Sequence, residues 1–319
     1  MKKHTRVITI FNQKGGVAKT TTTVNIAAIM GDVLKKKVLI IDFDAQGSAT
    51  LMCNLPNWDE EILDIGDLLE GFALDGIVAD NDDILSAIHK GGYEKNVQTF
   101  NQKERKLEWN SQKIDFPFDI IPVCGTALSI AELAIHRRES FIYQKVEYSF
   151  YMLKIIVDKI VNFNYYDYII IDANPSLSNF AINSLAAADY LIVPTTMTLE
   201  SISGINNILN RLKELNLMFP HFHTLGILYQ RFSGRRTLDR NILDEMDFDE
   251  FETKIPDVNT KVSKSISEGK IPSLRNTERD YANFRQSYID LCNEIEEKIE
   301  RFESEKGEIQ RKGVPGYAD

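Results

Sequence analysis

Short continuous runs of apolar residues, separated by longer stretches with helical spacing, are the main pattern along the chain. A run at residues 7–11 is followed by an amphipathic stretch at 20–34, and a second run follows at 38–41. Continuous apolar runs that alternate with helices indicate a parallel sheet covered on both faces. We therefore predict an α/β fold with a doubly wound, mostly parallel sheet flanked by helices. Further strands are predicted at residues 118–123, 166–171, 190–193 and 225–229, and further helices at 140–162 and 281–305.

Two segments do not follow this alternation. Residues 91–115 contain Gly-Gly, several Asn and Gln, and mixed charge, which predicts a surface insertion with a hairpin around residues 99–109. Residues 306–319 are charged and then contain Gly and Pro, so they predict a flexible C-terminal tail. We predict a single domain over residues 1–305 that includes this surface insertion.

Composition narrows the class of protein. The chain has 319 residues and a formal net charge of −10, which argues against a histone-like binder but leaves room for a local basic face that binds DNA. No apolar run approaches the ~20 residues of a membrane-spanning helix, and the first residues lack the apolar stretch of a signal peptide. The scattered Cys53, Cys124 and Cys292 fit core packing in a reducing compartment. We expect a cytoplasmic protein.

A glycine-rich turn follows the first predicted strand and opens the first predicted helix. Such a turn points backbone N–H groups outward, and the helix N-terminus adds partial positive charge, so together they form a cradle for phosphate. Lys19 can reach the β- and γ-phosphates, and the Thr20 hydroxyl can ligate Mg²⁺. The sequence therefore predicts a nucleoside triphosphate site. Its predicted cofactor-binding residues are Lys14, Gly15, Gly16, Val17, Ala18, Lys19, Thr20 and Thr21.

The strict P-loop pattern G-x-x-x-x-G-K-[ST] does not fit, because Gln13 and Ala18 stand where its glycines should be. The segment instead matches the deviant form K-G-G-x-G-K-[ST], which is distinguished by an additional lysine at its start, here Lys14.

Three aspartates follow predicted strands and complete the candidate site. Asp42 and Asp44 follow the second strand, and Asp172 ends the apolar run at 166–171 in the manner of a Walker B motif. Ligands of doubly wound sheets sit at the carboxyl ends of the strands, so these carboxylates should emerge near the phosphate cradle. They can hold Mg²⁺ and position the attacking water. A helix N-cap is the alternative structural role for an Asp at the end of a strand.

These motifs resemble those of the ParA/MinD-type deviant-Walker P-loop ATPases. Within that family the chain is closest to the ParA partition ATPases that lack an N-terminal helix-turn-helix. Ile255 and Pro256 resemble the loop that packs on the adenine. The resemblance covers most of the chain except residues 91–115 and about the last fifteen. It is carried by residues 12–21, 42–50, 166–177 and 187–194.

The resemblance implies a role for each site residue. Lys14 would reach the partner's phosphates in an ATP-bound homodimer, with Lys19 and Asp44 as the other catalytic residues. Thr20, Asp42 and Asp172 would act around Mg²⁺. The ATP dimer would bind duplex DNA non-specifically on the nucleoid. A centromere-binding ParB-like partner would stimulate hydrolysis and so release the dimer from DNA. Repetition of this cycle would partition a plasmid or chromosome.

Three departures from the family pattern concern the rate of hydrolysis. Ala18 replaces a glycine, Ala45 replaces the proline after Asp44, and Asn174 replaces the first proline after Asp172. The latter two loosen the loops that hold water and metal. We therefore expect slow, partner-stimulated hydrolysis.

The sequence leaves open what the ATP state binds. The last helix is rich in glutamate, which argues against an anionic membrane. Asp257 replaces a family arginine and weakens the case for DNA. The alternative is an ATP-gated switch that docks a protein complex without binding DNA, whereas a nitrogenase-type enzyme is disfavoured by the cysteine pattern. The candidate DNA-binding residues are Arg235, Arg236, Lys261, Lys264 and Lys270.

Overall fold

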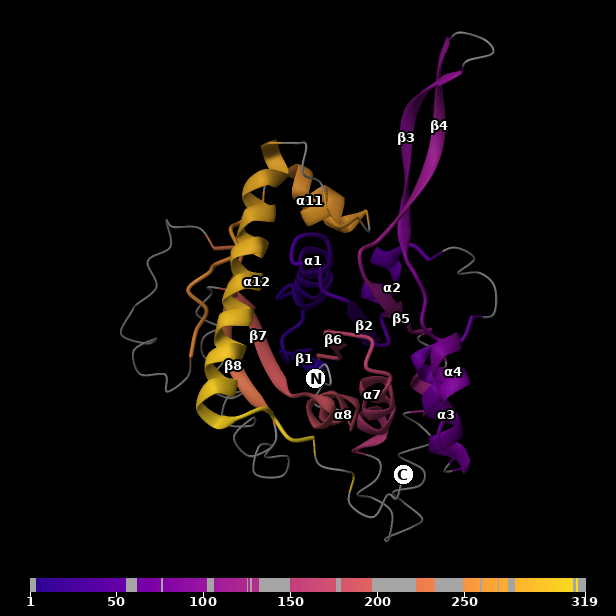
Figure 1. Cartoon of the computed structure of the whole chain (residues 1–319), viewed down its shortest axis with the longest axis vertical. Helices are drawn as coiled ribbons and strands as arrows, with labels where there is room; N and C mark the ends of the chain where they lie inside the picture. Colours follow the sequence, from indigo (N-terminus) through magenta and orange to yellow (C-terminus); the bar gives the residue numbers. More distant parts are fainter. Residues whose placement is uncertain are drawn as a thin grey trace.

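A parallel β-sheet lies at the centre of the computed structural model (Figure 1). Among the residues that the structure describes, strands follow the order β5-β2-β6-β1-β7-β8 and every neighbouring pair is parallel, which confirms the predicted fold class. The strands are β1 (Arg6–Ile10), β2 (Val38–Phe43), β5 (Asp119–Ile121), β6 (Tyr168–Ala173), β7 (Tyr190–Thr196) and β8 (His223–Gln230). The described residues are 4–55, 62–75, 77–101, 106–124, 126, 128–131, 150–175, 179–196, 222–232, 249–258, 260–268, 270–274, 279–311 and 314.

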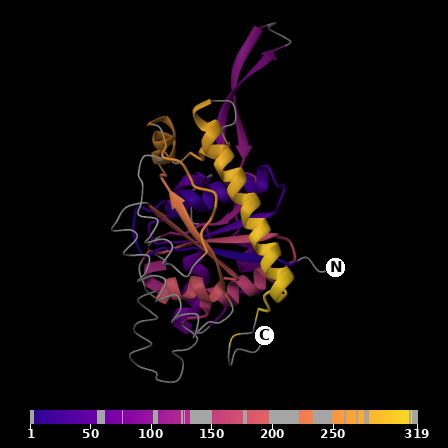
Figure 2. The same ribbon diagram turned by 90° about the vertical axis from the view of Figure 1, so that its left-hand side faces the viewer.

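Helices cover both faces of this sheet (Figures 1 and 2). Successive strand residues point to opposite faces. Ile8 and Ile10 of β1 therefore pack in the core with α1 (Lys19–Asp32) and α12 (Arg279–Lys306), whereas Val7 packs in the core with α3 (Ile65–Asp75) and α7 (Met152–Asn162). The apolar strands are therefore buried on both sides, as their continuous apolar runs predict. The helices are α1 (Lys19–Asp32), α2 (Ser48–Cys53), α3 (Ile65–Asp75), α4 (Asn81–Ser86), α7 (Met152–Asn162), α8 (Asn179–Ala187), α11 (Thr260–Ser267), the 3-10 turn η1 (Pro272–Leu274) and α12 (Arg279–Lys306).

Two element boundaries differ from the predictions. The strand predicted at 118–123 is shorter, because only Asp119–Ile121 pairs with β2. The helix predicted at 140–162 is seen from Met152 onward, and the part of it at 140–149 lies outside the described residues.

An antiparallel hairpin projects from the edge of the molecule beside α2 (Figures 1 and 2). Strands β3 (Gly92–Asn101) and β4 (Lys106–Asp115) pair along their whole length, so the predicted hairpin exists and is longer than predicted. Its base is fixed to the body, since Asn54 Nδ2 donates to Gly92 O at 3.2 Å and the Phe116 ring stacks on Phe118 at 5.4 Å. Gly31 of α1 also allows close approach there, because a Cβ atom would meet Pro117 O at 2.0 Å.

Some glutamates of α12 bond to residues of the sheet, whereas others are exposed to solvent. Glu296 accepts from Tyr168 Oη at 2.7 Å, and Glu303 forms two hydrogen bonds with Arg6 at 2.8 and 2.7 Å. Several of these acidic residues therefore fix the helix to the starts of the strands, while Glu297 and Glu300 are exposed. No helix in the described part of the chain combines the length and the apolar character needed to cross a bilayer.

The start of the predicted flexible tail is packed against the body. Helix α12 extends to Lys306, and Ile309 and Val314 are buried with exposed fractions of 9% and 7%. Arg311 forms ion pairs with Asp158, which is partly exposed, and with Asp189, which is fully buried. These residues of the segment predicted as a flexible tail therefore contact the body, and the polar composition of the segment did not reveal that the arginine has carboxylate partners.

Candidate functional site

The loop between β1 and α1 is anchored by a buried asparagine. Asn12 Nδ2 donates to Pro194 O at the end of β7 at 2.7 Å, and Asn12 Oδ1 accepts from Lys14 N at 2.8 Å. This side chain is 1% exposed. Asn12 therefore holds the start of the loop against the neighbouring strand β7 and also fixes the backbone at Lys14.

The loop residues have the backbone conformations that a phosphate cradle requires. Gly15 and Gly16 are exposed, and Gly16 has a φ of 74°. Ala18 is the N-cap of α1 with φ 65° and ψ 32°, in the left-handed region that glycine adopts without penalty. The departure from the family glycine thus falls at a position where the backbone favours glycine.

Replacing Ala18 by glycine is expected to raise the free energy of unfolding by up to about 1 kcal/mol, because it relieves this left-handed strain. Chemical denaturation of the nucleotide-free protein measures the effect. Ala27→Gly is the control, since Ala27 is a helical and buried residue of α1. The control should destabilise the protein, and destabilisation by both substitutions would contradict the strain argument.

Lys19 lies beneath the loop and faces two carboxylates. Its Nζ is 3.4 Å from Lys14 O, and its side chain is 7% exposed. Burial lowers the pKa of Lys19, while the charges of Asp172 and Asp44 act in the opposite direction. The residue is thus held between the loop that cradles phosphate and the acidic residues at the ends of β2 and β6.

Asp172 provides an oxygen atom suited to a metal ion. It is the residue before the last of β6, which pairs with β1, and its Oδ1 accepts from Thr23 Oγ1 of α1 at 3.1 Å. Its Oδ2 is buried and has no hydrogen-bond partner among the residues that the structure describes. Burial raises the pKa of Asp172. A divalent cation beside this oxygen would supply the missing partner and favour the ionised carboxylate.

Asp42 and Asp44 differ in their surroundings. Asp42 is fully buried, and its Oδ2 accepts from Thr50 N at 2.8 Å and from Thr50 Oγ1 at 2.7 Å. Burial and the neighbouring Asp172 raise the pKa of Asp42. Asp44 is only partly buried, and its Oδ1 accepts from Gln46 N at 3.1 Å. The register places Asp42 opposite Asp172, so the two carboxylates lie on adjacent strands.

These residues fit a magnesium ion bound together with phosphate. Magnesium in nucleotide sites takes one or two protein oxygens, and the remaining ligands are waters and phosphate oxygens. Within the described part of the chain, no group of three or more His, Cys, Asp or Glu side chains could hold a metal alone. The residues that would hold it are Thr20, at the start of α1, and Asp172, and Asp42 lies opposite Asp172 on the adjacent strand.

The predicted adenine loop lies at the end of β8. Ile255 N donates to Tyr229 O at 2.9 Å, and Phe232 N donates to Ile255 O at 2.8 Å. Gln230 Nε2 at the end of the same strand donates to Thr22 Oγ1 in the first turn of α1 at 2.9 Å. The segment that carries Ile255 and Pro256 is therefore joined through β8 to the helix that follows the phosphate loop.

The described candidate DNA-binding residues lie on α11 and just after it. Lys261 and Lys264 are exposed on α11, and Lys270 is exposed just after it. Glu268 lies among them, 3.6 Å from Lys264 and 2.6 Å from Lys270. Arg235 and Arg236 lie outside the described residues.

Three polar residues of the site were not assigned roles from the sequence. They are Asn12, which fixes the loop, Thr23, which orients Asp172, and Gln230, which ties β8 to α1. Asn12 lies in the segment that resembles the family motif, and its place in that motif could have indicated a role in the site. The partners of Thr23 and Gln230 are distant in sequence, and no local pattern indicates them.

The parallel sheet and the phosphate loop at the end of β1 define this chain as a P-loop ATPase. Residues 5–221 match the family model AAA_31, described as an AAA domain. The chain therefore belongs to this family, and it is a ParA/MinD-type P-loop ATPase.

Relatives agree with this family, and a solved structure shares the fold. The chain is 27% identical to the sporulation initiation inhibitor protein Soj of Bacillus subtilis, over 91% of this chain and 98% of that protein. It is 27% identical to the chromosome-partitioning ATPase Soj of Thermus thermophilus, over 76% of each chain. Its fold is similar to cobyrinic acid a,c-diamide synthase of Mycobacterium smegmatis with a bound ATP analogue and magnesium, with a TM-score of 0.63, 21% identity and coverage of 97% and 99% of the two chains.

Proposed function

We propose that this chain is an ATP-dependent dimerising ATPase of the ParA type, which binds duplex DNA non-specifically in its ATP state. With a centromere-binding ParB-like partner it would partition a plasmid or chromosome. The observation that carries this proposal is the deviant phosphate loop, in which Lys14 follows the Asn12 anchor and Lys19 lies beneath. The similarity to a chromosome-partitioning ATPase supports it.

Each site residue has a role in this proposal. ATP supplies the γ-phosphoryl group that is transferred to water, and Mg²⁺ neutralises charge on its oxygens. Lys19 and the backbone N–H groups of the loop bind the phosphates. Thr20 and Asp172 hold the metal, while Asp44 orients the attacking water. Ile255 and Pro256 pack on the adenine.

Lys14→Gln tests the cross-dimer role of Lys14. We expect turnover to fall at least about tenfold, because a cation that stabilises transferring phosphate is removed. ATP affinity of the monomer should stay within about twofold of the wild-type value, since Lys19 supplies the charge in the same chain. Phosphate release and equilibrium ATP binding measure the two effects, with the exposed Lys306→Gln as control. Normal dimerisation and turnover in Lys14→Gln would remove the cross-dimer role.

DNA binding is tested with random-sequence duplex DNA and purified full-length protein. Fluorescence anisotropy is measured with ATP, ADP or no nucleotide, between about 50 and 200 mM salt. We expect binding only with ATP, with affinity that falls steeply with salt because lysines displace counterions. The double substitution Lys261→Ala and Lys264→Ala should weaken binding and reduce the salt slope, whereas Lys306→Ala should not.

A protein-docking switch is the second candidate function. It is favoured by Asp257, which stands where the related ATPases carry arginine, and by Glu268, which pairs with Lys264 and Lys270 on the predicted DNA-binding surface. Absence of DNA binding in every nucleotide state, with normal ATP binding, would favour this function over partition by DNA binding.

A further inference from the structure

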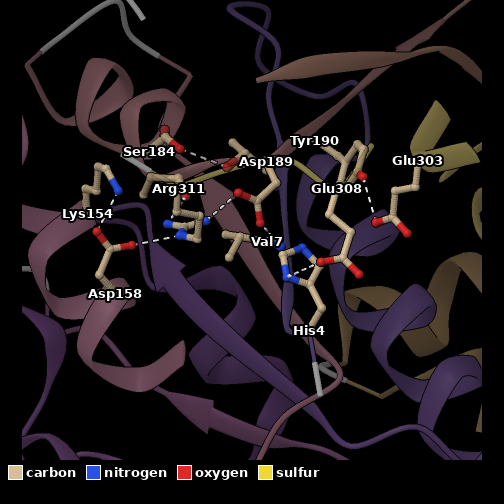
Figure 3. Close-up of polar contacts among 12 residues, drawn as sticks. His4, Val7, Lys154, Asp158, Ser184, Asp189, Tyr190, Glu303, Glu308 and Arg311 are labelled. Atoms are coloured by element: carbon tan, nitrogen blue, oxygen red, sulfur yellow. Dashed lines mark hydrogen bonds and ion pairs between the residues drawn. The ribbon is translucent and has the colours of Figure 1, made fainter. Parts of the chain in front are cut away.

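A buried arginine fixes the segment after α12 to the body (Figure 3). We call residues 307–311 the strap. Arg311 Nε donates to Asp158 Oδ1 at 2.7 Å, Nη1 to Asp189 Oδ1 at 2.6 Å, and Nη2 to Ala187 O at 2.8 Å. The Arg311 side chain is 11% exposed. A planar guanidinium with several donors in fixed directions suits such a set of acceptors.

The three acceptors belong to different parts of the sheet and its helices. Asp158 is in α7, Ala187 is the last residue of α8, and Asp189 directly precedes β7. The second oxygen of Asp189 accepts from Val7 N of β1 at 2.8 Å. Arg311 therefore joins α7, α8, β7 and β1, and none of these elements can shift against the others without loss of a charge-assisted hydrogen bond.

Helix α8 connects this cluster with the nucleotide site. It follows Asp172 in the chain, and its nine residues span about 13 Å. Near its start, the Phe180 ring packs edge-on against Phe43, the residue between Asp42 and Asp44, with centroids 5.2 Å apart. Farther along α8, Ser184 O accepts from Thr9 Oγ1 of β1 at 2.8 Å. One end of this helix thus packs against the end of β2 that carries the site carboxylates, and the other end is bound by Arg311.

We propose that Arg311 is a remote positioning residue for the nucleotide site, and that seating of the strap and binding of Mg²⁺ and ATP favour each other. Binding beside Asp42 and Asp172 orders the ends of β2 and β6, and the end of β2 packs on the start of the helix through the Phe43–Phe180 contact. Arg311 orders the opposite end, so each event lowers the entropic cost of the other. Such coupling is reciprocal, because the factor by which ATP protects the strap equals the factor by which the strap raises ATP affinity. The inference rests on the nucleotide site and does not require DNA binding.

Amide hydrogen exchange of the wild-type protein is the first test. We expect the peptide that contains residues 307–311 to exchange about fivefold more slowly with Mg²⁺ and ATP than without nucleotide. Lys19→Ala should show no such change, because it cannot bind ATP. The measurement is repeated at several protein concentrations, since protection by burial in a dimer depends on concentration. Identical exchange of the strap with and without ATP would overturn the proposal.

Substitution of the arginine is the second test. We expect Arg311→Gln to weaken binding of Mg²⁺ and ATP about fivefold, and Arg311→Lys to recover part of this loss because it retains the charge. Arg301→Gln removes an exposed arginine of α12 and should leave the affinity unchanged. A folded Arg311→Gln protein with wild-type ATP affinity would overturn the proposal, and thermal unfolding verifies the fold. If Arg311→Gln does not fold, the hydrogen-exchange experiment on the wild-type protein still tests whether ATP binding and seating of the strap are coupled.

Discussion

Lys19→Ala is expected to abolish ATP binding, with a loss of affinity of at least about 100-fold. The lysine is 7% exposed, and its ammonium group lies beneath the phosphate loop, 3.4 Å from Lys14 O. Burial lowers its pKa, and the Asp172 and Asp44 carboxylates beside the ammonium group act in the opposite direction. Alanine removes this cation and leaves two carboxylates that repel an anionic ligand. Equilibrium binding of a fluorescent ATP analogue measures the loss.

Lys306→Ala is the control for this substitution. It removes one positive charge from an exposed position at the end of α12, so the net charge of the two variants is the same. Thermal unfolding should show that Lys19→Ala is folded. Micromolar ATP binding by folded Lys19→Ala would refute the assignment of the nucleotide site to this loop.

The phosphate loop and the sheet could be predicted because both depend on local sequence. A continuous apolar run such as residues 38–41 must be buried on both faces, and a Gly-Gly turn between a strand and a helix leaves few conformations. Ala18, which stands where the family pattern has glycine, adopts the left-handed conformation with φ 65°. The order of the strands, in contrast, depends on pairings such as Val7 with Ile169, which are far apart in the chain.

The roles that could not be predicted depend on long-range polar contacts. Asp42 was predicted as a metal residue, and the structure shows one of its oxygens bonded to both Thr50 N and Thr50 Oγ1. Arg311 was placed in a flexible tail, although its partners Asp158 and Asp189 are more than a hundred residues away. Hydrophobic periodicity reports burial of apolar residues, so it gives no signal for a buried ion pair.

Asp44→Ala is expected to produce an ATP-bound dimer that does not turn over. The Asp44 carboxylate is partly buried and accepts from Gln46 N at 3.1 Å, so its backbone segment is held while the side chain borders the site. It lies two residues after Asp42, at the end of a strand adjacent to β6. Loss of a group that orients or deprotonates water lowers hydrolysis by about 100-fold or more, whereas the groups that bind phosphate remain. ATP affinity should therefore be retained.

Phosphate release and light scattering after gel filtration with ATP measure turnover and the dimer of Asp44→Ala. Glu300→Gln, which removes an exposed negative charge from α12, is the control and should hydrolyse ATP at the wild-type rate. Because Asp44 also contributes negative charge beside Lys19, its removal should not weaken the attraction for phosphate. A variant that binds ATP and hydrolyses it at the wild-type rate would assign the positioning of water to another residue. A variant that cannot bind ATP would show that Asp44 supports the loop itself.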